Sequence, residues 1–433
     1  MYPFTGNYYN WLAFNLTKFK LDLDVNENFV NYLTNDIDKN LLKDDKVDIS
    51  VKMFYDTSIY NNKVYLYFGI TPIILFYLPF YLATNYFVSD HLVILFLSIF
   101  IFILQILIYK KISILSLQNK KLTVIPVLIF GLCSGILLTY VSITIHLIAI
   151  FTCIFCSLVA LHIFLLLSDD KYKNLKMFLL GLFLAFAIGA RLISVILTMF
   201  IFIATLTIDS KKYIFYSSKL QNFKTSNLLK KYSYFFLPLI IYGIILALYN
   251  YLRFDSIFDF GFKYQFSPNH MVNITKDFYF VVQHLFYNIF YIPKFITINP
   301  YVIFNNASIN NFEPLIGGFI IAPIIISLIG LLKFNFLKNY KLIFLFFIVT
   351  ISTSFIYLCI DSYKGSNARF VTEYLFLLLV PSLFLFYNFM ETENNFILKN
   401  IIKILFLCLT IFSLYINTNL INCIFLMSKN GVI

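Results

Sequence analysis

Long apolar runs alternate with short polar strips along most of this chain. The run HLVILFLSIFIFILQILIY, residues 91–109, contains no charged side chain and approaches the ~20 residues that a helix needs to cross a bilayer. The pattern predicts an all-α, polytopic membrane protein with about ten transmembrane helices and further helices on the extracytoplasmic surface. The predicted spans are 91–109, 122–141, 145–167, 175–190, 192–208, 234–252, 314–332, 342–360, 371–389 and 401–420.

Composition supports this class and removes others. Of the 433 residues, 60% are hydrophobic and only 12% are charged. The formal net charge of +12 comes from lysines that lie in strips between apolar runs, which is typical of cytoplasmic loops and does not favour nucleic-acid binding. Cys153 and Cys156 have C-x-x-C spacing, but they lie in an apolar run without a second pair, so we interpret them as small helix residues and predict no metal site. Metal dependence stays open.

The lysine strips predict the orientation of the helices. Because cytoplasmic loops carry an excess of positive charge, the strips place residue 91 outside and alternate loops inside. The long segment 253–313, the loop 361–370 and the tail 421–433 are then extracytoplasmic. The strips that we assign to the cytoplasm are 110–121, 171–176, 211–231, 333–341 and 399–403.

The run YNNKVYLYFGITPIILFYLPF, residues 60–80, is apolar but contains Gly69, Pro72 and Pro79. Proline interrupts helical hydrogen bonding, so we expect a bent, half-buried helix on the outer face rather than a crossing. Residues 1–90 then form an extracytoplasmic loop with juxtamembrane helices, and residues 91–420 form the transmembrane domain. We expect a first transmembrane helix that precedes Met1; the alternative is a short tail translocated with the first hairpin.

The three arginines of the chain, Arg191, Arg253 and Arg369, all fall at predicted extracytoplasmic helix ends, whereas thirty lysines supply the rest of the basic charge. A guanidinium presents a planar fork of donors that holds phosphate in two-point contact. With Lys364, they are candidate phosphate-binding residues, and Glu373 is a candidate partner that orients Arg369. The alternative is that each arginine snorkels or pairs with a local acid.

Five stretches together resemble the bacterial integral-membrane glycosyltransferases of the GT-C class, such as protein O-mannosyltransferases and lipid A aminoarabinose transferases. The resemblance implies inverting transfer of a hexose or pentose from a polyprenyl-phosphate donor to a glycan, lipid or protein acceptor. It places the site outside the bacterial cytoplasmic membrane. The stretches are GNYYNWLAFNLTKFKLDL, YDTSIYNNKVYLYFGITPIILFYLPFYL, GLFLAFAIGARLISVI, YNYLRFDSIFDFGFKYQ and GSNARFVTEY.

The family places a catalytic acid early in the first outer loop, but the corresponding stretch here, GNYYNW, has none. A carboxylate is needed because an acceptor hydroxyl is a poor nucleophile until its proton is accepted. Asp56, Asp22 and Asp24 are the candidate catalytic residues, with Asp56 favoured because it adjoins the proline-containing run. Tyr67 and Tyr264 are candidate supporting residues.

Two other functions remain open at the level of sequence. A lipid or glycolipid transporter, or flippase, would also bind an anionic lipid among many helices, although such proteins often carry ionisable residues near the midplane. An inactive GT-C relative that lacks the first helix and the acid is the third interpretation.

Overall fold

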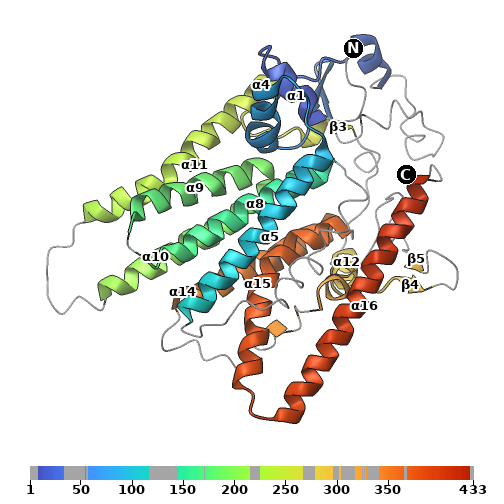
Figure 1. The fold of residues 1–433 in the computed structure, drawn as a ribbon. Helices are drawn as coiled ribbons and strands as arrows, with labels where there is room; N and C mark the ends of the chain where they lie inside the picture. Colours follow the sequence, from blue (N-terminus) through green and yellow to red (C-terminus); the bar gives the residue numbers. More distant parts are fainter. Residues whose placement is uncertain are drawn as a thin grey trace.

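Helices dominate the computed structural model (Figure 1). The structure describes residues 8–33, 54, 57–116, 145–169, 171–214, 225–266, 278–295, 302–303, 317–323, 325, 327–328, 341–364 and 368–429.

Seven helices in this part of the chain are long and apolar enough to cross a membrane, and each overlaps one of the ten predicted spans. The protein is therefore an integral membrane protein by the length and composition of its helices. The seven lie in α5 (Asp90–Leu115), α8 (Ile145–Leu166), α9 (Lys173–Ala190), α11 (Thr225–Phe254), α14 (Lys341–Lys364), α15 (Ala368–Thr392) and α16 (Phe396–Lys429).

Ten spans are not confirmed. The run 192–208 forms a 3-10 turn, η4 (Leu192–Ser194), followed by α10 (Val195–Ile214), and its apolar part is shorter than the seven candidates. The predicted span 122–141 lies outside the described residues. The predicted span 314–332 is described only in part, with α13 (Gly318–Ile321) as its α-helix there.

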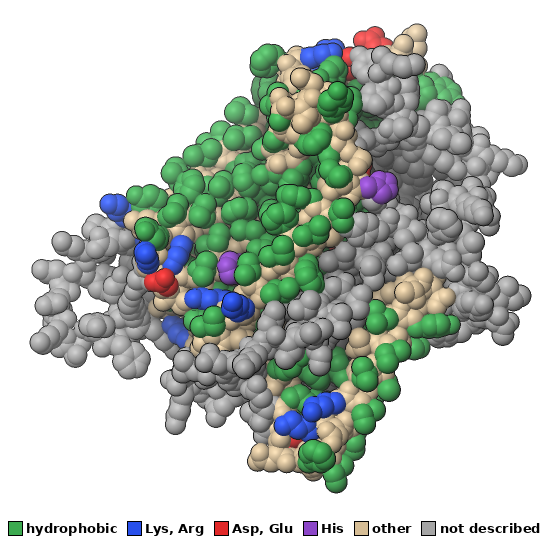
Figure 2. Space-filling view, viewed as in Figure 1, with side chains coloured by type: hydrophobic (Ala, Val, Ile, Leu, Met, Phe, Trp, Pro, Cys, Tyr) green, Lys and Arg blue, Asp and Glu red, His purple; other side chains and the backbone are tan. Residues whose placement is uncertain are grey.

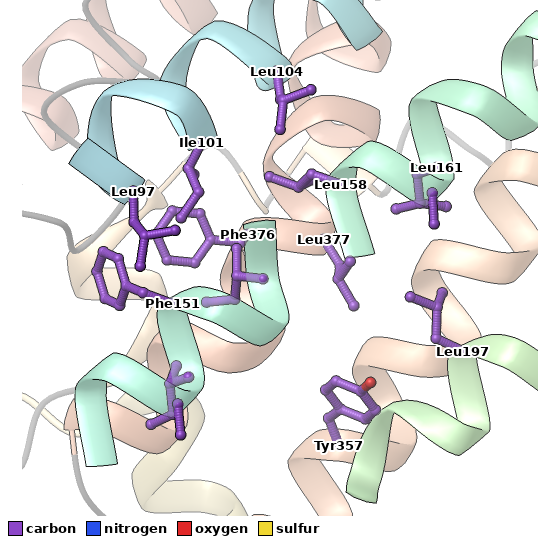
Figure 3. Packing of buried hydrophobic residues seen from close by; sticks show 14 of the residues in the cluster. Leu97, Ile101, Leu104, Phe151, Leu158, Leu161, Leu197, Tyr357, Phe376 and Leu377 are labelled. Carbon is purple, nitrogen blue, oxygen red and sulfur yellow. The ribbon is translucent and has the colours of Figure 1, made fainter. Parts of the chain in front are cut away.

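The core lies around α8 and α15, which are the most deeply buried of the seven helices at 83% and 78% of their apolar windows. Phe151 of α8 packs edge-on against Phe376 of α15, and Leu97 and Ile101 of α5 lie beside them (Figure 3). α16 is the opposite case, with 6% of its window buried, so most of its surface is left for lipid.

A glycine lets α9 and α11 approach closely. α9 packs against both α8 and α11, and a Cβ on Gly181 of α9 would lie 2.1 Å from the carbonyl oxygen of Phe235 in α11. Only a glycine fits at this crossing, which is typical of close helix packing in membranes.

One end of the helix bundle, which we call the capped end, is covered by short elements. α1 (Tyr8–Leu16), the hairpin of β1 (Thr57–Tyr60) and β2 (Lys63–Leu66), and α4 (Leu78–Thr84) gather there (Figure 1). Strand β3 (Gln265–Phe266), which follows α11, extends the sheet in the antiparallel order β2-β1-β3.

The hairpin turns at Asn61 and Asn62, which both have positive φ, because asparagine tolerates the left-handed conformation that a two-residue turn requires. The sequence pattern predicts only helices here, so this sheet, whose strands are two to four residues long, corrects that expectation. The remaining described elements are α2 (Glu27–Asn31), η5 (Phe262–Tyr264), α12 (Phe278–Phe290), and the two-residue pair β4 (Lys294–Phe295) and β5 (Val302–Ile303).

The proline-containing run forms a π-helix, η3 (Ile73–Tyr77), that continues into α4. Pro72 directly precedes η3, and Pro79 is the second residue of α4, so its missing N–H falls at the junction where the helix changes from π to α geometry. Together they make an apolar helix, Ile73–Thr84, that is shorter than the candidate spans.

Lysines gather at the end of the bundle opposite the cap, where α5 ends and α9 and α11 begin, and an apolar band covers the middle of the visible face (Figure 2). At this end, the ammonium group of Lys176 donates hydrogen bonds to the carbonyl oxygens of Leu166 and Asp169, which lie in the α8–α9 connection. The charge distribution has the form expected of helices that cross a bilayer.

Candidate functional site

Arg191 lies where α9 ends at the capped end of the bundle. Its backbone is extended (φ −147°, ψ 118°), and the chain then makes the single turn η4 before α10 begins. The Arg191 N–H still donates to the carbonyl oxygen of Ala187, and its own carbonyl accepts from the N–H and hydroxyl of Ser194. The break is therefore closed by local hydrogen bonds, as a buried helix end requires.

The Arg191 side chain forms an ion pair with Glu373, which lies in the second turn of α15. Arg191 Nη2 is 2.6 Å from Glu373 Oε1, and the two side chains are 15% and 5% exposed. Asp361 of α14 is fully buried and interacts electrostatically with the same guanidinium. Two acids thus surround one arginine in a membrane domain, where buried charge is costly and usually marks a functional site.

Tyrosines extend this group toward the cap. Tyr9 of α1 is fully buried, stacks on Tyr77 with ring centroids 5.3 Å apart, and interacts electrostatically with Arg191. Tyr77 in turn donates a 2.6 Å hydrogen bond to Oδ1 of Asp90 at the start of α5. The helix α1 therefore brings a buried tyrosine into the electrostatic surroundings of Arg191.

We define the Arg191 cluster by the electrostatic neighbours of this ion pair. Tyr67, at the end of β2, interacts with Arg191, while Cys153 of α8 and Tyr357 of α14 interact with both Arg191 and Glu373. Six elements or their flanks contribute to the cluster: α1, β2, α8, α9, α14 and α15. Its members are Arg191, Glu373, Asp361, Tyr9, Tyr67, Tyr357 and Cys153.

A contact between two glycines brings the proline-containing run to the end of α9. A Cβ on Gly69 would lie 1.8 Å from the carbonyl oxygen of Gly189, so the two backbones touch. Nearby, the hydroxyl groups of Thr71 and Tyr242 are 2.6 Å apart in a hydrogen bond. The approach places Tyr67, two residues before Gly69, beside Arg191.

Arg253, near the end of α11, has a different environment. Its Nη1 donates to the carbonyl oxygen of Leu66 at 2.8 Å, and its Nη2 donates to Oδ1 of Asn250 at 2.9 Å. The guanidinium also stacks on the rings of Tyr249 and Phe254. Arg253 thus joins α11 to the hairpin through neutral acceptors, and its predicted role in phosphate binding stays a prediction.

The remaining predicted phosphate ligands lie at the same end. Lys364 ends α14 and Arg369 is in the first turn of α15, one turn before Glu373. Their side chains lie outside the described residues. Glu373 was predicted to orient Arg369, and the structure shows that it pairs with Arg191.

The candidate catalytic acids are not brought into the Arg191 cluster by the described contacts. Asp24 pairs with Lys20 at 2.9 Å on the surface, and Oδ2 of Asp22 accepts the backbone N–H of Asp24. Asp56 lies outside the described residues. Among the predicted supporting residues, Tyr67 joins the cluster, whereas Tyr264 stacks on Phe254 beside the hairpin.

Sequence reasoning missed four members of the cluster: Asp361, Tyr9, Tyr357 and Cys153. Asp361 had a usable signal, because it is an acid directly after the apolar run 342–360. We placed it in a loop, but α14 continues to Lys364 and holds it inside the protein. The other three are ordinary residues of apolar helices, and nothing in their local sequence sets them apart.

The cluster centres on one guanidinium, whose charge is opposed by the carboxylates of Glu373 and Asp361. Within the described ranges, no group of three His, Cys, Asp or Glu side chains is placed to hold a metal ion. A guanidinium has five N–H donors, and those that Glu373 does not engage are chemically able to donate to an oxyanion.

Comparison of the chain with protein-family models, with curated proteins and with solved structures gives no match.

Proposed function

We propose that the protein is a membrane glycosyltransferase that moves a sugar from a polyprenyl-phosphate donor to a hydroxyl acceptor, with Arg191 as the phosphate-binding residue. The observation that carries this proposal is the largely buried Arg191–Glu373 ion pair, with Asp361 as a second acid, at the break between α9 and η4. Ionisable side chains inside a membrane domain are rare and costly, which supports a ligand-binding role for this pair.

The geometry of the ion pair suits a phosphate ligand. Glu373 is engaged by Nη2 of Arg191, and the other N–H groups of a guanidinium can donate to a phosphate oxygen. Glu373 also fixes the position of the arginine before the ligand arrives, which lowers the conformational entropy lost on binding. A lysine at this position would offer a point charge without the planar fork.

The proposed reaction breaks the bond between C1 of the sugar and the phosphate oxygen and forms a bond from C1 to the acceptor oxygen. The electron pair leaves with the polyprenyl phosphate, whose developing charge Arg191 stabilises. A carboxylate accepts the proton of the acceptor hydroxyl. Asp56 stays the predicted base, whereas Asp24 is already paired with Lys20.

The side of the membrane belongs to the same proposal. The positive-inside tendency assigns the lysine-rich end of the bundle to the cytoplasm and the capped end, with the Arg191 cluster, to the outside of a bacterial cytoplasmic membrane (Figure 2). Polyprenyl-phosphate sugars that are used outside the cell would enter the cluster from the outer leaflet.

A transfer assay tests the proposal. The purified protein in lipid nanodiscs is incubated with radiolabelled polyprenyl-phosphate hexoses and pentoses and an extract of cell-envelope acceptors, and release of polyprenyl phosphate is measured. We expect Arg191→Lys to slow release at least about tenfold, since loss of a charge-assisted hydrogen bond costs roughly 1.5–3 kcal/mol.

Lys263→Arg is the matched control, because it alters a basic side chain at the same end that is 73% exposed and paired with Asp259. It should retain wild-type release. Equal rates for Arg191→Lys and the wild type would refute the role of Arg191. A donor that binds and crosses the bilayer with its sugar still attached would instead favour the lipid transporter.

A further inference from the structure

A small cavity lies behind the Arg191–Glu373 ion pair, between α8, α14 and α15. Its polar lining comes from Glu373, Tyr357, Ser157 and Cys153, and Leu377 is among its apolar residues. Leu377 and Tyr357 point toward one another across this part of the core (Figure 3). The volume open to the centre of a water molecule is about 10 Å³, close to the room that one water needs.

The Tyr357 hydroxyl is the second observation. Tyr357 is 4% exposed, and its hydroxyl has no hydrogen-bond partner among the residues that the structure describes. The group interacts electrostatically with Cys153, Glu373 and Asp361. A buried hydroxyl without a partner costs about 1–3 kcal/mol, so a polar partner inside the cavity would stabilise a tyrosine at this position.

We propose that this cavity binds one water molecule, which accepts a hydrogen bond from the Tyr357 hydroxyl and donates one to the Glu373 carboxylate. Ser157 supplies a third polar neighbour at the cavity wall. Three polar partners are the usual number for a buried water, and the bond to an ionised carboxylate is stronger than one between neutral groups.

The water gives Tyr357 a positioning role, and this second step rests on the proposed function. When a phosphate engages Arg191, Glu373 has to share its guanidinium partner with the ligand. The water keeps a hydrogen bond on the carboxylate during this exchange, so that Glu373 is not left as a poorly solvated buried charge. Tyr357 acts through the water and Glu373 without touching the substrate.

Radiolytic footprinting tests the water site in the protein without any lipid substrate. Hydroxyl radicals formed from a bound water oxidise the side chains around it, so X-ray exposure of the nanodisc-embedded protein in H₂¹⁸O should label Cys153 and Tyr357 although both are buried. The matched controls are Cys156, which is fully buried in the same helix, and Tyr374, which is 4% exposed and donates to the carbonyl oxygen of Asn288. Neither is among the residues that line the cavity.

We expect several-fold more ¹⁸O at Cys153 than at Cys156 and at Tyr357 than at Tyr374. Equal labelling within each pair would overturn the water site. Labelling that changes when sodium replaces choline in the buffer would show a bound cation in place of water and would also overturn it.

The Tyr357→Phe variant separates the two steps of the inference. In the footprint it should bring the labelling of Cys153 down to that of Cys156, and Ser157→Ala serves the same purpose if Tyr357→Phe does not fold. In a binding measurement with polyprenyl phosphate, Tyr357→Phe should raise the Kd about tenfold, which corresponds to one hydrogen bond to a charged group. If Tyr357→Phe changes the footprint but not the Kd, the positioning role is refuted and the water site stands. If the wild type fails to transfer sugar, the proposed function is refuted, but the footprint is unaffected because it uses no lipid substrate.

Discussion

Arg253 is buried and Arg191 largely buried at the capped end, yet their guanidinium groups have different partners. Arg253 donates to the carbonyl oxygens of Leu66 and Tyr249 and to the amide oxygen of Asn250, and it lies 3.7 Å from the centroid of the Tyr249 ring. Arg191 forms an ion pair with Glu373, with Asp361 nearby.

The difference indicates which arginine can exchange its partner. The acceptors of Arg253 belong to the backbone and to neighbouring turns, so replacing them with a ligand would detach β2 from α11. The partner of Arg191 is a side chain whose charge can be shared with an incoming anion. Burial alone therefore does not distinguish the two arginines, whereas the chemical type of their acceptors does.

The largest expected effect comes from Arg191→Met. This change leaves the Glu373 carboxylate buried without its partner, which should lower the free energy of unfolding by about 3–5 kcal/mol. Adding Glu373→Leu should recover most of the loss, because removing both charges removes the desolvation cost as well. Denaturant unfolding of the detergent-solubilised variants measures both values, and a double variant as unstable as Arg191→Met would contradict the ion-pair account.

A smaller effect is expected from Arg253→Met. The change leaves the carbonyl oxygen of Leu66 and the side chain of Asn250 without a donor, at a cost of about 1–3 kcal/mol. The same unfolding assay applies. Removing the nearby acid with Asp259→Asn should give no rescue, because neutral groups supply the hydrogen-bond acceptors of Arg253. A rescue comparable to that of Arg191→Met by Glu373→Leu would erase the contrast between the two arginines.

The smallest expected effect is a pH dependence of the stability of the loop that follows Arg253. Burial alone would raise the pKa of Asp259, but hydrogen bonds from Lys263 and from the Gly261 N–H lower it overall. The hydrogen bond to Asp259 raises the pKa of Lys263, which is largely exposed, so its contribution is screened by solvent.

The signs follow from linkage. The stability that ionised Asp259 gives to the folded loop is present above its unfolded pKa, ~3.9, and is lost as the pH falls through the lower folded pKa. The stability that protonated Lys263 gives to the folded loop is present below its unfolded pKa, ~10.4, and is lost as the pH rises through the higher folded pKa. Hydrogen exchange of residues 255–266, corrected for intrinsic rates, should accelerate at both extremes in the wild type, whereas Asp259→Asn should remove both changes.

The spans were predictable because long apolar helices depend on local composition. Seven of the ten predicted runs overlap long apolar helices in the described part of the chain. The boundaries were less predictable, since α14 extends beyond its apolar run and carries Asp361 with it. The hairpin at Asn61 and Asn62 had a signal in the paired asparagines, but its strands are too short to show an alternating pattern.

The candidate site was only partly predictable. Arg191 and Glu373 were each singled out by sequence, but as members of different groups, because they lie far apart in the chain and no local pattern links them. Tyr9 and Tyr357 look like the many other tyrosines of this chain. What unites the cluster is the packing of α1, α8, α9, α14 and α15, which arises from contacts between distant segments.

The meeting of Gly69 and Gly189 has a mechanical consequence. No side chain lies between the two backbones, so a change of rotamer cannot accommodate a displacement of either one. A displacement of the proline-containing run would therefore press directly on the last turn of α9. Arg191, two residues further on, would be the first charged side chain to feel such a displacement.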